Sequence, residues 1–200
     1  DGDGDRSTTT LTISLSDGGL MAPDDNDALV YEKALDTAAT GADLAAGSVT
    51  GSDPTSTGET DASNQLTATG GTGPYTYALV GSPAGTYGTI QINSDGSYTY
   101  TLTSPFGTSP DANNGAHTEE NQESFTYQVT DANGNTATGT ITVDIVDDVP
   151  TAQADTANVA EGAAINGNVL TDGTDDVFGA DGATGGGGVI GVRAAEIGRA

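Results

Sequence analysis

Short runs in which apolar and polar residues alternate recur along the chain, and clusters of glycine, asparagine and aspartate separate them. A period of two is typical of a strand that buries one face. The runs span residues 11–15, 75–79, 90–92, 98–102, 125–129 and 141–145. Asp95-Gly96 and Asn133-Gly134 lie between successive runs and predict hairpin turns. No segment shows a convincing helical period, and even residues 28–46 are expected to form a strand and a loop. The pattern therefore predicts an all-β fold, an antiparallel sandwich or barrel.

The sequence also contains an internal repeat. Residues 1–5 align with residues 131–135 at an offset of 130, and the same offset places residues 10–17 on residues 140–147. Such self-similarity is the signature of a tandem array. We therefore expect three parts: the C-terminal hairpin of a preceding repeat (1–22), one complete β-sandwich repeat (23–148) and the N-terminal part of the following repeat (149–200).

Charge narrows the range of partners. The 200 residues carry 29 acidic and 4 basic side chains, a formal net charge of −25. This balance excludes ordinary binding to nucleic acid or to an anionic membrane, because both require clustered lysine and arginine. No stretch approaches the roughly 20 apolar residues that span a bilayer, so direct membrane insertion is not expected. The chain has no cysteine and a single histidine, His117, which leaves few groups for thiol, zinc or imidazole chemistry.

Signals for an enzyme are poor. No nucleophile elbow surrounds any serine that could act with His117. The glycines at 185–188 lack the lysine and serine or threonine that complete a phosphate-binding loop. Alternation with threonine favours core packing over a sugar-binding platform for five tyrosines: Tyr75, Tyr77, Tyr98, Tyr100 and Tyr127. We therefore expect no enzymatic activity.

Three stretches carry a resemblance to a known class of repeats. Residues 85–100 resemble the core of VCBS-type repeats, and residues 125–134 followed by 141–150 are similar to the closing hairpin and linker of the Ig-like or cadherin-like repeats of large bacterial adhesins. Residues 167–172 resemble the opening of the next such repeat. The resemblance implies tandem Ig/cadherin-like antiparallel β-sandwich modules in an RTX or large-adhesion-protein-like molecule. The glycine-rich nonapeptide array of a calcium β-roll is absent.

The same resemblance implies a function. Such proteins leave the bacterial cell by type I secretion and act at the cell surface in adhesion and biofilm formation. Their repeats are extenders, stiffened by Ca²⁺, that carry a terminal binding domain away from the cell, and their partners are neighbouring repeats of the same chain. An alternative is a module that binds glycan or another surface polymer through residues 104–123, a long connection that contains His117.

Acidic residues gather where the repeats are expected to meet, and Ca²⁺ takes six to eight oxygen ligands. By resemblance to the cadherin junction, one joint would use Asp24, Asp25, Asp27 and Glu32, and the other Asp147, Asp148, Asp155 and Glu161. Without metal, like charges would repel and the joint would flex. The alternative is that these acids are solvated linker residues that aid solubility.

A second candidate cation site follows from alternate oxygen side chains on a tight loop, as in the first half of an EF-hand. The residues are Asp1, Asp3 and Asp5 and, in the second copy, Asp131, Asn133 and Asn135. Both copies lack the closing glutamate, and the alternative is an ordinary hairpin turn. Other loop acids are further candidates: Asp53, Glu59, Asp61, Asp172, Asp175, Asp176 and Asp181.

Overall fold

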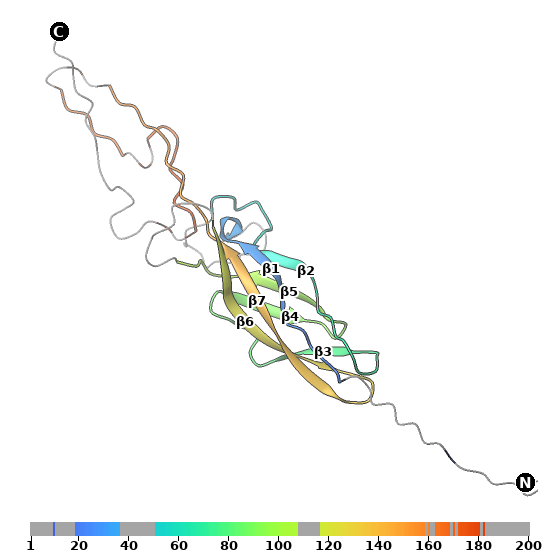
Figure 1. Cartoon of the computed structure of the whole chain (residues 1–200). Helices are drawn as coiled ribbons and strands as arrows, with labels where there is room; N and C mark the ends of the chain where they lie inside the picture. Colours follow the sequence, from blue (N-terminus) through green and yellow to red (C-terminus); the bar gives the residue numbers. More distant parts are fainter. Residues whose placement is uncertain are drawn as a thin grey trace, which may run out of the picture.

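The computed structural model describes residues 10, 19–36, 51–107, 117–158, 160, 163–168, 170, 172–180 and 182. Within them seven strands form two packed sheets (Figure 1). The first sheet has the order β1 (Asp25–Tyr31), β7 (Thr136–Val146), β6 (Thr118–Thr130), β3 (Thr76–Val80). The second has the order β2 (Thr60–Gln65), β5 (Ser97–Leu102), β4 (Gly88–Ile92). The expected all-β sandwich is confirmed, while the strand predicted at 11–15 lies outside the described residues.

Two predicted hairpins are present. β4 pairs antiparallel with β5, and β6 pairs antiparallel with β7. Gly96 and Gly134 have φ of 90° and 84°, a region where glycine is favoured because it has no Cβ. One pairing differs from the antiparallel expectation, because β1 runs parallel to β7. The one helical element described is a short 3-10 turn, η1 (Glu32–Ala34).

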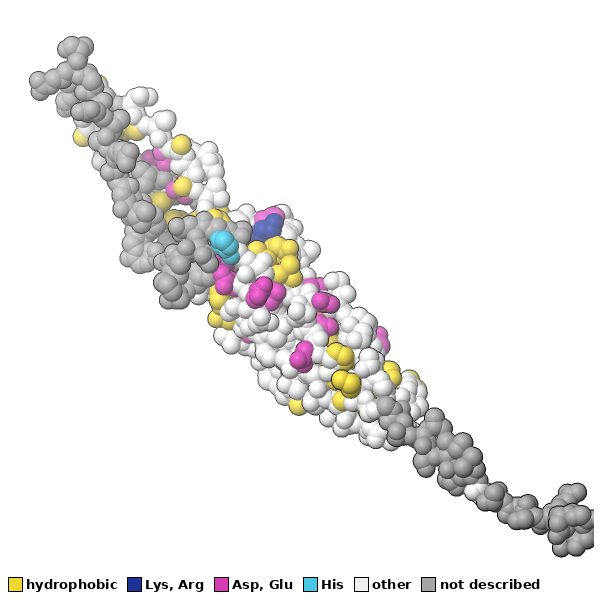
Figure 2. Space-filling view, viewed as in Figure 1, with side chains coloured by type: hydrophobic (Ala, Val, Ile, Leu, Met, Phe, Trp, Pro, Cys, Tyr) yellow, Lys and Arg dark blue, Asp and Glu magenta, His cyan; other side chains and the backbone are white. Residues whose placement is uncertain are grey.

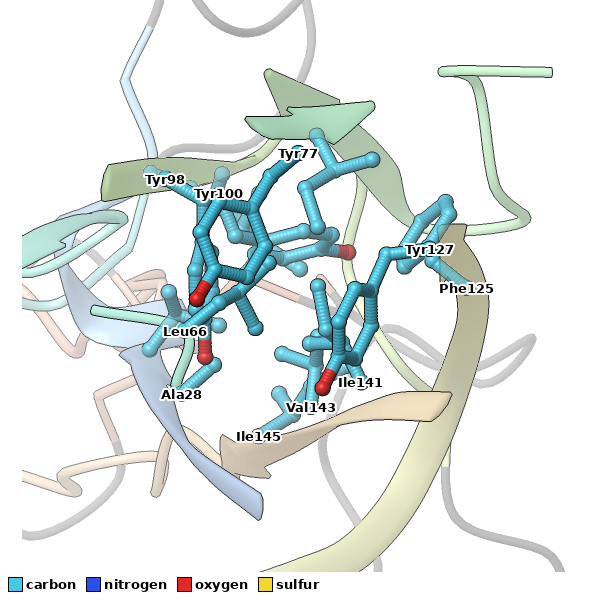
Figure 3. Close-up of a cluster of buried hydrophobic side chains, with 14 of the residues drawn as sticks. Ala28, Leu66, Tyr77, Tyr98, Tyr100, Phe125, Tyr127, Ile141, Val143 and Ile145 are labelled. Atoms are coloured by element: carbon cyan, nitrogen blue, oxygen red, sulfur yellow. The ribbon is translucent and has the colours of Figure 1, made fainter. Parts of the chain in front are cut away.

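The core lies between the two sheets and follows the alternation in the sequence. β5 buries every second residue, and β6 and β7 do the same along most of their length. Side chains from both sheets point toward one another in the close-up of this cluster (Figure 3). Four of the five tyrosines considered above are buried: Tyr77, Tyr98, Tyr100 and Tyr127. Their predicted role in the core is confirmed, whereas Tyr75 is only partly buried.

Buried tyrosines need partners for their hydroxyl groups, since an unpaired buried donor is costly. Tyr98 donates to Asp25, Tyr100 donates to Glu123, and Tyr127 donates to the Pro23 carbonyl. Burial, with Tyr77 and acids nearby, raises the pKa of Tyr127 to about 12. The rings therefore fill the core while their hydroxyl groups bond to buried or partly buried carboxylates and to backbone.

Candidate functional site

The parallel pairing of β1 with β7 decides which acids share an end of the sandwich. The two strands start at one end and finish at the other. Asp24 and Glu32 are therefore separated by the length of β1, roughly 25 Å at the rise of a strand. We expected Glu32 to share a site with Asp24, Asp25 and Asp27. That grouping is wrong, because the strand holds Glu32 at the opposite end.

The aspartates at the start of β1 hold this strand in place. Asp24 Oδ1 accepts a hydrogen bond from Thr140 N at 2.8 Å, and Asp25 Oδ1 accepts one from the Tyr98 hydroxyl at 2.5 Å. Asp27 is exposed, and its backbone N–H donates to Asp25 Oδ1 at 3.3 Å. Burial, together with the bond to Asp25, raises the pKa of Tyr98. Asp24 and Asp25 thus fasten β1 to β7 and β5.

Glu32, Asp147 and Asp148 come together at the other end. Glu32 is fully buried, and its carboxylate accepts hydrogen bonds from Phe106 N and from Asp148 N, the latter at 3.1 Å. Asp147 N donates to the carbonyl of His117 at 3.0 Å. One buried carboxylate therefore joins the end of β1, the end of β7 and the loop that follows β5.

Asp147 is the electrostatically strained member of this group. Burial raises its pKa above the usual value, a hydrogen bond with Glu32 acts in the opposite direction, and the charge of Glu119 adds to the rise. Carboxylates this close resist simultaneous ionisation. A proton or a cation at this end would relieve the repulsion.

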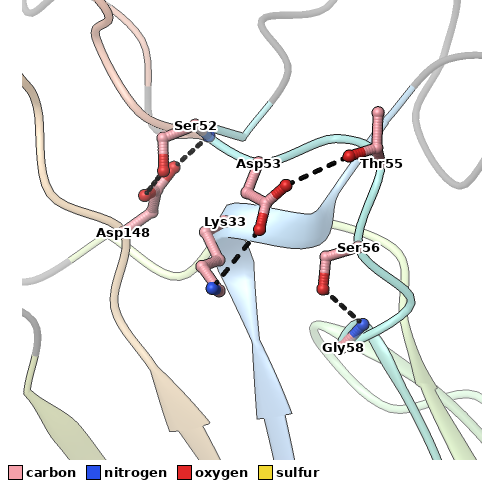
Figure 4. A network of polar contacts seen from close by, with 7 residues as sticks. All are labelled: Lys33, Ser52, Asp53, Thr55, Ser56, Gly58 and Asp148. Atoms are coloured by element: carbon pink, nitrogen blue, oxygen red, sulfur yellow. Dashed lines mark hydrogen bonds and ion pairs between the residues drawn. The ribbon is translucent and has the colours of Figure 1, made fainter.

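Asp148 is occupied by protein donors (Figure 4). Its Oδ2 accepts Ser52 N at 2.7 Å, and its Oδ1 accepts Ser52 Oγ at 2.5 Å. Outside that view, Oδ2 also accepts Ala180 N at 3.1 Å. Beside it, Lys33 Nζ lies 3.4 Å from Asp53 Oδ2, with both side chains nearly half exposed. This ion pair is therefore worth little to stability.

The acids at this end do not form a ready-made calcium site. The oxygens of Glu32 and Asp148 already accept hydrogen bonds from backbone N–H groups. Across the described ranges, no group of three or more His, Cys, Asp or Glu side chains could hold a metal ion. Asp155 lies on the following segment, with Oδ1 buried beside Gly173, and Glu161 lies outside the described residues.

Asp131 braces its own hairpin turn. Oδ1 accepts the backbone N–H groups of Asn133 and Asn135 at 2.9 and 2.8 Å, and Oδ2 accepts Asn135 Nδ2 and Thr72 N at 2.9 and 3.2 Å. The side-chain bond from Asn135 is the largest of the effects that lower the pKa of Asp131. These contacts account for Asp131 as a turn residue. The first copy of this turn, with Asp1, Asp3 and Asp5, lies outside the described residues.

The candidate glycan-binding connection is shorter than expected, because β6 begins at Thr118. Residues 108–116 lie outside the described residues. The part that is described packs on the sandwich: the Phe106 ring meets Tyr87 edge to face at 5.1 Å between centroids, and Phe106 N is bound to Glu32. Acidic side chains are scattered over the visible face of the sandwich rather than gathered in one patch (Figure 2).

Two buried acids, Asp36 and Glu123, were absent from the predicted sites. Glu123 is 5 % exposed, its Oε1 accepts the backbone N–H groups of Thr86 and Tyr87, and its Oε2 accepts the Tyr100 hydroxyl at 2.8 Å. A signal for it existed in the sequence, since residue 123 has the same alternation phase as the buried residues 125, 127 and 129.

Comparison of the sequence with protein-family models and with curated proteins finds no match. In the part of the chain that the structure describes, no helix is long and apolar enough to cross a membrane.

Proposed function

We propose that this chain is a spacer repeat of a secreted bacterial surface adhesin, without enzymatic activity of its own, whose immediate partners are the neighbouring repeats. The observation that carries the proposal is the path of the backbone. Residues 19–22 lie at one end of the sandwich, where Met21 pairs with Thr69, and the segment after Asp148 leaves from the other end (Figure 1). Modules connected in this way add their lengths in an array.

The strand partition supports the finer assignment to an Ig-like or cadherin-like module. In an immunoglobulin constant domain the second, fifth and fourth strands share one sheet and the third, sixth and seventh share the other. The same partition is present here, with β1 placed beside β7. β7 has 11 residues, so each module would contribute about 35 Å of length at the rise of a strand.

The excess of acidic over basic side chains suggests that the module binds Ca²⁺. The formal net charge is −25, and Lys33 is the one lysine or arginine in the described residues, already beside Asp53. Ca²⁺ near Glu32 and Asp147 would favour the ionised carboxylates that burial disfavours. Extracellular modules bind Ca²⁺ weakly, at about 10⁻⁴–10⁻³ M.

Small-angle scattering on the whole chain tests the spacer role. We expect an elongated particle. Its radius of gyration should exceed the value of about 16 Å for a compact domain of 200 residues. A compact scattering profile would contradict the spacer role.

Thermal unfolding in millimolar Ca²⁺ and in chelator tests the calcium part. Binding to the folded state alone raises the melting temperature. We expect a rise in the parent that is lost in Asp147→Asn, while the exposed Asp95→Asn retains it. Equal melting temperatures with and without Ca²⁺ would refute calcium binding and leave the spacer role intact.

A further inference from the structure

The segment that follows β7 returns to the sandwich. Thr151 and Val177 pair through two backbone hydrogen bonds, of 2.8 and 3.0 Å, and Gln153 N donates to Asp176 Oδ1 at 2.6 Å. After this pairing, Ala180 is 4 % exposed and belongs to the hydrophobic cluster of the core. The junction therefore has a second point of attachment besides the covalent chain.

Asp148 stands at this second attachment. Its carboxylate receives three hydrogen bonds from two segments: two from Ser52, which is 96 residues away in sequence, and one from Ala180 N. Gly179 has φ of 76°, and a Cβ there would lie 3.2 Å from the Asp148 carbonyl, so a side chain at this position would be both strained and crowded. The backbone of the following segment can approach Asp148 closely because residue 179 is a glycine.

We propose that Asp148 is a metal-independent latch that fixes the following segment to the sandwich, an inference that deepens the proposed spacer role and rests on it. Hydrogen bonds to a carboxylate are stronger than those between neutral groups. Asp148 is 8 % exposed, and detachment of the following segment would remove the Ala180 N–H donor from its buried carboxylate. The latch surface consists of Ser52 and Asp148, and its occupant is the backbone at residues 179–180 of the same chain.

The repeat alignment indicates that the preceding junction lacks this latch. Asp17 aligns with Asp147, and the next position holds Gly18 where the second junction has Asp148. Glycine has no side-chain acceptor, so the sequence of the preceding junction offers no carboxylate at the position of Asp148.

A distance measurement between two spin labels tests the latch. The chain has no cysteine, so Thr89→Cys and Thr174→Cys, both at exposed positions, give one label on β4 and one on the following segment of the full chain. In chelator we expect a single narrow distance distribution. Asp148→Asn should abolish the narrow peak, and Ser52→Ala should broaden it partially, because Ser52 N still donates. The exposed Asp175→Asn removes an equal charge from the following segment and should leave the peak unchanged.

The outcomes separate the latch from the proposed function. A broad distribution for the parent in chelator, or an unchanged peak in both Asp148→Asn and Ser52→Ala, would overturn the latch. A narrow parent distribution that Ca²⁺ does not alter supports the latch and contradicts calcium stiffening. A compact particle in scattering, with the latch distances as expected, contradicts the spacer role alone. Should Asp148→Asn fail to fold, Ser52→Ala carries the test.

Discussion

At the scale of single residues, buried carboxylates are used as structural acceptors. Inward-facing positions next to the apolar runs of three strands hold four acids: Glu32, Glu123, Asp131 and Asp147. A buried carboxylate is tolerated when hydrogen-bond donors surround it. Asp131 has four donors and Glu123 has three, whereas Asp147 has a raised pKa. At Asp147 burial outweighs the hydrogen bonds that lower its pKa, whereas at Asp131 the hydrogen bonds outweigh burial.

Asp131 makes a prediction about pH. Its pKa is lower in the folded protein than its usual value of 3.8, so it contributes stability above that value and loses the contribution as pH falls through the lower, folded pKa. Asp131→Asn should therefore be less stable than the parent at pH 6, with a difference that narrows toward pH 2. Denaturant unfolding across this range measures it. A difference that does not change with pH would show that the carboxylate charge is not what stabilises the turn.

At the scale of elements, alternation predicted the strands that carry an apolar face. β3, β4, β5, β6 and β7 all lie on predicted runs because their inward positions are apolar. β2 was missed because its sequence, TDASNQ, offers no apolar alternation, and Asn64 is its buried residue. The parallel pairing of β1 with β7 could not be predicted from the sequence either, since a pairing between residues more than 110 positions apart leaves no local signal.

The candidate site was predictable in part for the same reason. Extending the inward phase of β1 by one step reaches Glu32, and extending that of β7 reaches Asp147. Local pattern thus marks both acids as buried. Their meeting at one end depends on the parallel β1–β7 pairing, and the contact of Asp148 with Ser52 depends on a loop. Neither is encoded in spacing along the chain.

Glu123 on β6 connects the two sheets through its hydrogen bonds to Thr86, Tyr87 and Tyr100, and this Glu123 brace can be tested. Its carboxylate fills the space where a side chain at Gly85 would lie. Gly85→Ala should cost about 1–3 kcal/mol of unfolding free energy through overpacking, whereas Gly19→Ala, which has open space around it, should cost little.

A double-mutant cycle gives the decisive measurement for this brace. Glu123→Ala vacates the space, so Gly85→Ala should cost less in that background, giving a non-additive pair. Strict additivity would show that the two positions do not interact.

At the scale of the whole molecule, charge opposes folding. The formal net charge is −25, and the described residues contain one ion pair, Lys33 with Asp53. Added salt therefore screens more repulsion than attraction between the protein's charges. The Debye length falls from about 30 Å at 0.01 M to about 3 Å at 1 M ionic strength. We expect the melting temperature to rise with NaCl over this range. A fall would mean that attractive pairs dominate, and Ca²⁺ and Mg²⁺ compared at equal ionic strength separate screening from specific binding.

The parallel pairing of β1 with β7 also has a mechanical consequence. Tension on the chain would pull the start of β1 and the end of β7 in opposite directions, along the axis of both strands. The hydrogen bonds of a parallel ladder are evenly spaced along that axis. They are therefore loaded in shear and share the force, instead of opening one after another from an end. The module resists extension most strongly along the line on which an array would be pulled.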